Sequence, residues 1–240
     1  ALSKAPTKIG FDKNPFSFAY TLKIPHEIGN GTHEVERNLK LIAHHVTQPT
    51  SLRPEMYPSI EDYNRVKKYQ SDLYYCIAPT SVWFTKQMSA DKWVELIQSL
   101  DKQAKIYLLG APNDKEACEK IRIATQQENV VNLAGELSLP QSAALIKNAQ
   151  RTYVNDSGPL HISSAMNAPV TAFFCSTVPT FGFGPLSEDS EIIEITEENT
   201  ITVACSDNKL IAIEILSTDE GIMTAKQLSK KISIIGNTFN

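Results

Sequence analysis

Short apolar segments alternate with helix-period segments from about Leu73 onward. Five apolar segments are brief, rich in β-branched and aromatic residues, and flanked by Pro, Gly or Asn: 73–79, 106–110, 130–134, 152–155 and 170–174. Between them, apolar residues recur every three to four positions, as on one face of a helix. Strands that alternate with helices form βαβ units, so the sequence predicts an α/β fold with a doubly wound, parallel, Rossmann-like sheet covered on both faces.

The helices between these segments have recognisable starts. We expect them to begin at Ser89, at Asn113 or Asp114, at Ser138 with Pro140 in its first turn, and after Pro159. For the first three, the residues expected to face inward are, in order, Trp93, Leu96, Ile97 and Leu100; Ala117, Ile121 and Ala124; and Leu145 and Ile146.

The first seventy residues follow another pattern. An apolar stripe predicts one helix from about Thr32, with Val35, Leu39, Ile42 and Val46 on one face, and Ser59 with Asp62 forms a capping-box start for a second. One weak strand pair and two helices cannot close a sheet core. We therefore expect residues 1–70 to be the remnant of a preceding domain, 71–216 to form the Rossmann-like domain, and 217–240 to form a C-terminal helix and tail.

Composition excludes several classes of protein. Lys and Arg number 23 against 27 Asp and Glu, and 42% of residues are hydrophobic, which is ordinary for a packed chain and argues against disorder, a fibrous repeat or a strongly basic nucleic-acid binder.

The four cysteines form no CxxC pair and have no His at ligand spacing, which favours buried thiols over a zinc site. The opening residues lack a signal-peptide core and no apolar run suits a membrane span, so a cytoplasmic protein is expected.

One loop combines residues that suit phosphate binding. It spans 155–161, reads NDSGPLH and directly follows the apolar segment 152–155. Gly158 lets the backbone approach a ligand closely, and the helix that follows offers free N–H groups at its positive dipole end. Asp156 and His161 would flank a phosphate bound there.

A second loop spans 79–87, reads PTSVWFTKQ and follows the segment 73–79. It carries hydroxyls at Thr80, Ser81 and Thr85 and one cation, Lys86. Hydroxyls and a lysine suit a diphosphate, because the ammonium neutralises charge that backbone donors cannot. Ligands of open parallel sheets bind beyond the carboxyl ends of the strands, where both loops lie.

Each loop also has an ordinary structural interpretation. An Asp-Ser-Gly-Pro run is a common turn, and His161 could cap a helix or pack in the core. Lys86 could be solvated, and Trp83 and Phe84 could cover the sheet.

A Ser157–His161 hydrolase is not expected, because no GxSxG elbow occurs and the residues are too close in sequence for a triad. The sequence contains no GxGxxG or GxxxxGK[ST], which weakens dinucleotide-binding and P-loop interpretations.

At these loops the chain resembles glycosyltransferase family 9, the ADP-heptose:lipopolysaccharide heptosyltransferases. The resemblance is carried by PTSVWFTKQM at 79–88, LLGAPND at 108–114, LAGELSL at 133–139, VNDSGPLHISSA at 154–165 and GPL at 184–186. TKIGFD at 7–12 and HEVERN at 33–38 extend it weakly into the opening segment, whereas the tail from about Thr200 departs from the family pattern.

The resemblance implies a GT-B architecture, in which a C-terminal domain holds the nucleotide-sugar donor and an incomplete N-terminal domain holds the acceptor. It implies that Ser81, Thr85 and Lys86 contact the diphosphate, and that Ser157 and Gly158 bind phosphate oxygens through their backbone amides. It also implies that Asp156 and His161 face the sugar and the leaving phosphate. Asp114 would take the ribose position, and Leu137 would line the adenine pocket. The catalytic candidates are Asp156, Lys86 and His161.

We therefore expect an inverting glycosyltransferase that moves a heptose-like sugar from an ADP-sugar to a lipid-linked lipopolysaccharide core saccharide. No cofactor, metal ion or nucleic acid is expected, because no DxD-type pair is present and Lys86 with helix dipoles can replace an ion. Peripheral contact with the inner membrane could use Lys226, Lys230 and Lys231, which also suit a solvated face. The alternatives are a nucleotide-sugar-binding module that transfers nothing and another GT-B-like enzyme such as an epimerase.

Overall fold

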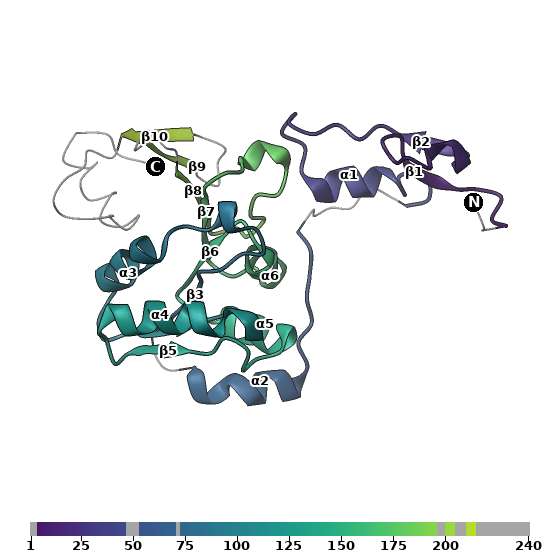
Figure 1. The fold of residues 1–240 in the computed structure, drawn as a ribbon. Helices are drawn as coiled ribbons and strands as arrows, with labels where there is room; N and C mark the ends of the chain where they lie inside the picture. The colour runs from purple at the N-terminus through teal and green to yellow at the C-terminus, as the bar shows by residue number, and fades with distance from the viewer. Residues whose placement is uncertain (1–3, 47–52, 71–72, 196–199, 205–209, 215–240) are drawn as a thin grey trace. The chain divides into compact units, whose positions relative to one another are not determined.

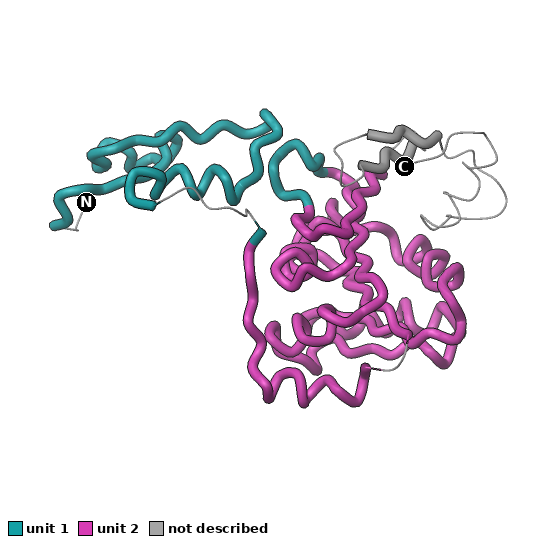
Figure 2. Tube along the Cα trace, turned by 180° about the vertical axis from the view of Figure 1, so that it is seen from behind, with its two compact units in different colours: residues 1–53, 177–184 teal, residues 54–176, 185–240 magenta. Residues whose placement is uncertain are grey.

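The computed structural model describes residues 4–46, 53–70, 73–195, 200–204 and 210–214, of which the last two segments are described by their backbone (Figure 1). The chain divides into two compact units: unit 1 is residues 1–53 with 177–184, and unit 2 is residues 54–176 with 185–240 (Figure 2). Cys205 and the helix expected within 217–240, with its lysines, lie outside the described residues.

Unit 2 contains an eight-stranded sheet with the strand order β10-β9-β8-β7-β6-β3-β4-β5. From β5 to β8 all neighbours are parallel, whereas β9 and β10 add antiparallel pairs at one edge. The strands are β3 (Tyr74–Ala78), β4 (Lys105–Leu108), β5 (Val130–Asn132), β6 (Arg151–Asn155), β7 (Val170–Phe174), β8 (Ser190–Ile195), β9 (Thr200–Ala204) and β10 (Leu210–Glu214). The predicted doubly wound parallel sheet is thus confirmed.

Helices cover both faces of this sheet. They are α2 (Ile60–Val66), α3 (Ala90–Ser99), α4 (Lys115–Thr125), α5 (Leu139–Ile146) and α6 (Gly158–Met166), with short 3₁₀ turns η2 (Lys67–Tyr69), η3 (Phe84–Lys86) and η4 (Pro112–Asp114). The helix pairs α2–α5 and α5–α6 are in contact, and α3 contacts α4.

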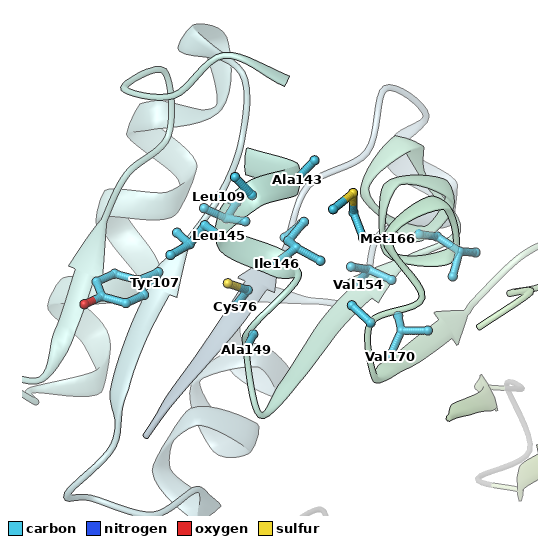
Figure 3. Packing of buried hydrophobic residues seen from close by; sticks show 14 of the residues in the cluster. Cys76, Tyr107, Leu109, Ala143, Leu145, Ile146, Ala149, Val154, Met166 and Val170 are labelled. Atoms are coloured by element: carbon cyan, nitrogen blue, oxygen red, sulfur yellow. The ribbon is translucent and has the colours of Figure 1, made fainter. Parts of the chain in front are cut away.

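Alternate residues of each buried strand serve two separate cores, as the pleat of a strand requires. In β3, Cys76 belongs to the core under α5 and α6, and Ile77 to the core under α3 and α4. Figure 3 shows the first core, in which Ile146 and Ala149 lie near Cys76. Burial on both faces explains why the strand segments read as continuous apolar runs.

The predicted helix faces are confirmed for α3 and α5, and in part for α4. Trp93, Leu96 and Ile97 of α3 are buried, and so are Leu145 and Ile146 of α5.

In α4, Ile121 is buried as predicted, but Ala117 and Ala124 are exposed, so the expectation is wrong for the two alanines. Cys118 and Thr125 complete the buried face of this helix. Alanine methyl groups offer little apolar area and therefore do not determine which face packs. The Thr125 hydroxyl tolerates burial because it donates to the Arg122 carbonyl oxygen at 2.7 Å.

Unit 1 contains β1 (Ile9–Phe11), the 3₁₀ turn η1 (Ser17–Ala19), β2 (Leu22–Ile24), α1 (Glu34–Lys40) and the 3₁₀ turn η5 (Pro179–Phe181). The strands β1 and β2 form a parallel pair, the weak strand pair that the sequence indicated. Helix α1 is shorter than predicted: His33 rather than Thr32 is its N-cap, and Ile42 and Val46 beyond its end are 44% exposed.

Arg37 joins the two chain segments of unit 1. Its side chain is buried, pairs with Glu34 at 2.7 Å and donates to the carbonyl oxygens of Thr32 and Phe181. Gly182 follows Phe181 at φ +92°, and a β-carbon there would collide with the Thr32 carbonyl. The small unit therefore depends on residues far apart in the sequence.

The division into units differs from the boundary expected at residue 70. Helix α2, whose predicted Ser59–Asp62 capping box is present, packs against α5 in unit 2. Across the helices of the described ranges, none has the length and hydropathy needed to cross a membrane.

Candidate functional site

The order of the strands places a switch point between β3 and β6. From β3 the chain winds outward through β4 and β5, and from β6 it winds the other way through β7 and β8. Doubly wound sheets bind ligands at this point, outside the carboxyl ends of the two central strands. The loops that leave β3 and β6 there are the 79–88 loop and the 155–158 turn, both of which the sequence singled out.

Lys86 and Asp156 meet across this switch point. The Lys86 Nζ lies 2.6 Å from Asp156 Oδ2, and the two side chains are 26% and 6% exposed. A carboxylate that is nearly withdrawn from water needs such a partner, because an unpaired buried charge is costly. The Lys86 side chain is less buried than that of Asp156 and keeps part of its surface accessible to a ligand.

Helix α6 starts beside this pair. Ser157 is extended (φ −156°, ψ 176°) and its hydroxyl donates to the Asn155 carbonyl oxygen at 3.2 Å. A β-carbon on Gly158, the first helical residue, would have no neighbouring atom within 4 Å. Pro159 has no N–H, and the Leu160 amide donates to the Ser157 carbonyl oxygen at 3.0 Å. The start of α6 therefore offers a ligand the amides of Ser157 and Gly158, and the helix dipole makes this end attractive to anions.

The interior of α6 is firmly anchored. Leu160, Ser163 and Ser164 are buried, and the Ser164 hydroxyl accepts a hydrogen bond from the Leu186 amide at 2.9 Å. Leu186 is the last residue of the GPL segment, and this hydrogen bond therefore ties the GPL segment to α6. His161 lies on the exposed side of the helix, three residues after Gly158.

Asn155 holds the 79–88 loop at both ends, a role that the sequence analysis missed. Its fully buried carboxamide donates to the Pro79 carbonyl oxygen at 2.8 Å and accepts from the Met88 amide at 2.9 Å. The signal in the sequence is a carboxamide at the last position of the strand, directly after the apolar residues Tyr153 and Val154. In this loop Ser81 is half-buried, while Thr85 in η3 is exposed.

The other expected site residues lie on neighbouring loops at the same edge of the sheet. Asp114 follows β4, and its carboxylate accepts the Ala111 amide at 2.7 Å, so one of its oxygens serves the local turn. Leu137 follows β5 and packs, partly buried, against the core under α5. Of the expected site residues, Lys86 and Asp156 are in direct contact.

This arrangement offers one ammonium group, the amides of Ser157 and Gly158 at the positive end of a helix dipole, and nearby hydroxyls, all of which suit a phosphate-containing ligand. Within the part of the chain that the structure describes, no group of three or more His, Cys, Asp or Glu could hold a metal ion.

The comparison with known proteins agrees with this architecture. A model of glycosyltransferase family 9 (heptosyltransferase) matches residues 1–210. Lipooligosaccharide heptosyltransferase 2 of Haemophilus influenzae is 36% identical over 107 residues, which are 43% of this chain and 31% of that protein. The chain thus aligns with about a third of this relative's length.

Two solved structures show the same fold. The Escherichia coli ADP-heptose LPS heptosyltransferase II matches with a TM-score of 0.68 and 21% identity over 96% of this chain and 70% of that one. An Escherichia coli heptosyltransferase solved with ADP matches with a TM-score of 0.59 and 23% identity over 78% of this chain and 59% of that one. The expected GT-B type of fold is therefore confirmed. Since the family model spans most of the sequence, the chain belongs to glycosyltransferase family 9, the heptosyltransferase family.

Proposed function

We propose that unit 2 binds the diphosphate of an ADP-sugar between Lys86 and the start of α6, and that the protein transfers a heptose-like sugar from it to a lipopolysaccharide core acceptor. One observation carries the proposal: the Lys86 ammonium lies 2.6 Å from Asp156, directly before a helix start that is open at Gly158. The relatives support it, since one is titled an ADP-heptose LPS heptosyltransferase and another was solved with ADP.

The chemistry of the site favours a diphosphate over a neutral ligand. Helix-start amides donate to phosphate oxygens, and the helix dipole adds a partial positive charge. Lys86 supplies the full positive charge that amides lack. Asp156 pairs with this ammonium in the ligand-free protein, and we assign it the role of orienting the ammonium toward the diphosphate.

The remaining residues take proposed roles around this anchor. Ser81 and Thr85 add hydroxyl donors, Asp114 offers its second carboxylate oxygen to ribose, Leu137 contributes to an adenine pocket, and His161 faces the sugar and the leaving phosphate. Residues 1–70 would then contribute to the acceptor side, and the acceptor would be lipid-linked at the cytoplasmic face of the inner membrane.

The proposed reaction is an inverting displacement. The bond between the anomeric carbon and the diphosphate oxygen breaks while the acceptor oxygen bonds to the opposite face of that carbon, and the acceptor proton passes to a general base. The leaving ADP gains negative charge as the bond breaks. Lys86 and the amides therefore bind the transition state more tightly than the ground state, which is what accelerates the reaction.

Calorimetric titration with ADP tests the binding step. We expect the Lys86→Ala variant to bind ADP about 10- to 100-fold more weakly, because a hydrogen bond to a charged group contributes roughly 1.5–3 kcal/mol. Lys147→Ala is the matched control: it also removes one ammonium and one hydrogen bond, from Nζ to the Met166 carbonyl oxygen at 2.7 Å, at the far end of α6. Equal affinity of both variants, or no ADP binding by the wild type, would refute the proposal.

A transfer assay with ADP-heptose and a lipopolysaccharide core acceptor tests the chemical step. Release of ADP that depends on the acceptor, and that falls in Lys86→Ala, supports the transferase. Tight ADP binding without acceptor-dependent release would instead identify a nucleotide-sugar-binding module.

A further inference from the structure

We propose that Asn155 is a positioning residue for Lys86: its carboxamide fixes the loop that carries this lysine to the end of β6, which Asp156 directly follows. The inference rests on the proposed binding of ADP at this site and names a further residue on which that binding depends. Asn155 would act through the geometry of the loop, with Lys86 making the contact with the phosphate.

The contacts of Asn155 join the two ends of one loop. Pro79 follows β3 directly, and Met88 lies just before Ser89, the N-cap of α3. The carboxamide bonds to both, at 2.8 Å and 2.9 Å, and it is completely buried. A carboxamide suits this place because one end donates to a carbonyl while the other accepts from an amide.

The tip of the loop has few buried apolar contacts to fix it, whereas Met88 at the end of the loop is 4% exposed and belongs to the core under α3 and α4. Its tip residues Val82, Trp83 and Phe84 are 96%, 68% and 81% exposed. A second polar contact, from Gln87 Nε2 to the Ser81 carbonyl oxygen at 2.6 Å, ties the loop to itself. The polar contacts and the buried Met88 side chain at the two ends of the loop, rather than burial of its tip, therefore fix the segment that carries the lysine.

Two further contacts involve Lys86 itself, one through its backbone amide and one through its side chain. Lys86 closes the η3 turn with its amide 2.9 Å from the Trp83 carbonyl oxygen, two residues before Met88. Asp156, the partner of its side chain, follows Asn155 directly. One pair of consecutive residues thus fixes both the backbone of the loop and the side chain of its lysine.

A double-mutant cycle separates positioning from simple stabilisation. We expect Asn155→Ala to weaken ADP binding at least tenfold, and we expect the Asn155→Ala, Lys86→Ala double variant to bind about as weakly as Lys86→Ala alone. Residues that act through one another are non-additive in this way. Calorimetry at a temperature where every variant is folded by circular dichroism provides the dissociation constants.

Tyr74→Phe is the matched structural control. It removes another buried hydrogen bond of the same sheet, from the Tyr74 hydroxyl to the Leu145 carbonyl oxygen at 2.8 Å, at the start of β3. Its ADP affinity should equal that of the wild type. If Asn155→Ala does not fold, Asn155→Ser makes the same test, because a short hydroxyl cannot reach both backbone groups.

The outcomes distinguish the two proposals. Asn155 variants that bind ADP as tightly as the wild type, while Lys86→Ala binds weakly, would overturn the positioning role and leave the proposed function standing. Additive losses in the double variant would also overturn it, because Asn155 would then act independently of Lys86. Absence of ADP binding in the wild type would overturn both.

Discussion

Replacing Gly158 by alanine should separate ligand binding from folding. A β-carbon at this position meets no atom within 4 Å, and Gly158 is not among the glycines with positive φ. Alanine therefore fits the folded chain, and by restricting the unfolded chain it should leave stability unchanged or raise it by about 0.4–1 kcal/mol.

The same methyl group should obstruct a phosphate. An oxygen that accepts a bond from a helix-start amide lies about 2.9 Å from its nitrogen, in the space that the new side chain would enter. Loss of one charge-assisted hydrogen bond corresponds to roughly 1.5–3 kcal/mol, or about 10- to 100-fold in the dissociation constant. Urea denaturation and ADP calorimetry on the same preparation measure both quantities.

Two results would refute this reasoning. Wild-type ADP affinity in Gly158→Ala would mean that no phosphate lies against the start of α6. A loss of stability would mean that the space before this helix is not open in the folded protein.

Two further predictions concern stability and thiol chemistry. Gly182→Ala should destabilise unit 1 by more than about 1 kcal/mol, because its φ of +92° is unfavourable for alanine and its β-carbon meets the backbone; a melting temperature equal to that of the wild type would contradict this. Burial raises the pKa of the Cys118 thiol to about 12 and raises the pKa of Cys76 further, so at pH 8 neither forms the reactive thiolate. Peptide mapping after iodoacetamide treatment should find the partly exposed Cys175 modified before Cys76 and Cys118, and rapid labelling of Cys76 in the folded protein would contradict the packing.

The sheet and its main helices could be predicted because their signals are local. Buried strands read as short apolar runs, and α3 and α5 carry stripes of large apolar residues. The proximity of Lys86 and Asp156 could also be predicted, because parallel strands place their carboxyl ends at one edge of the sheet. The sequence indicated both loops, and the neighbouring positions of β3 and β6 bring them together.

Other features depend on contacts that no local pattern reveals. The hydrogen bonds from the Asn155 carboxamide to the 79–88 loop require β3 and β6 to be adjacent, although these strands are far apart in the sequence. The partners of Arg37 include Phe181, which no periodicity near α1 indicates. In α4, two alanines fitted a helical stripe, but Cys118 occupied the core, because side-chain volume rather than spacing decided the packing.

The two-segment make-up of unit 1 has a consequence for synthesis on the ribosome. Residues 177–184 complete this unit, and they emerge only after β3 to β7 of the large sheet have been translated. The N-terminal residues must therefore wait, with the Arg37 guanidinium unpaired with the Phe181 carbonyl, until most of unit 2 has left the exit tunnel. In a nascent chain stalled before residue 177, residues 4–46 should consequently be accessible to proteases even where the sheet is already protected.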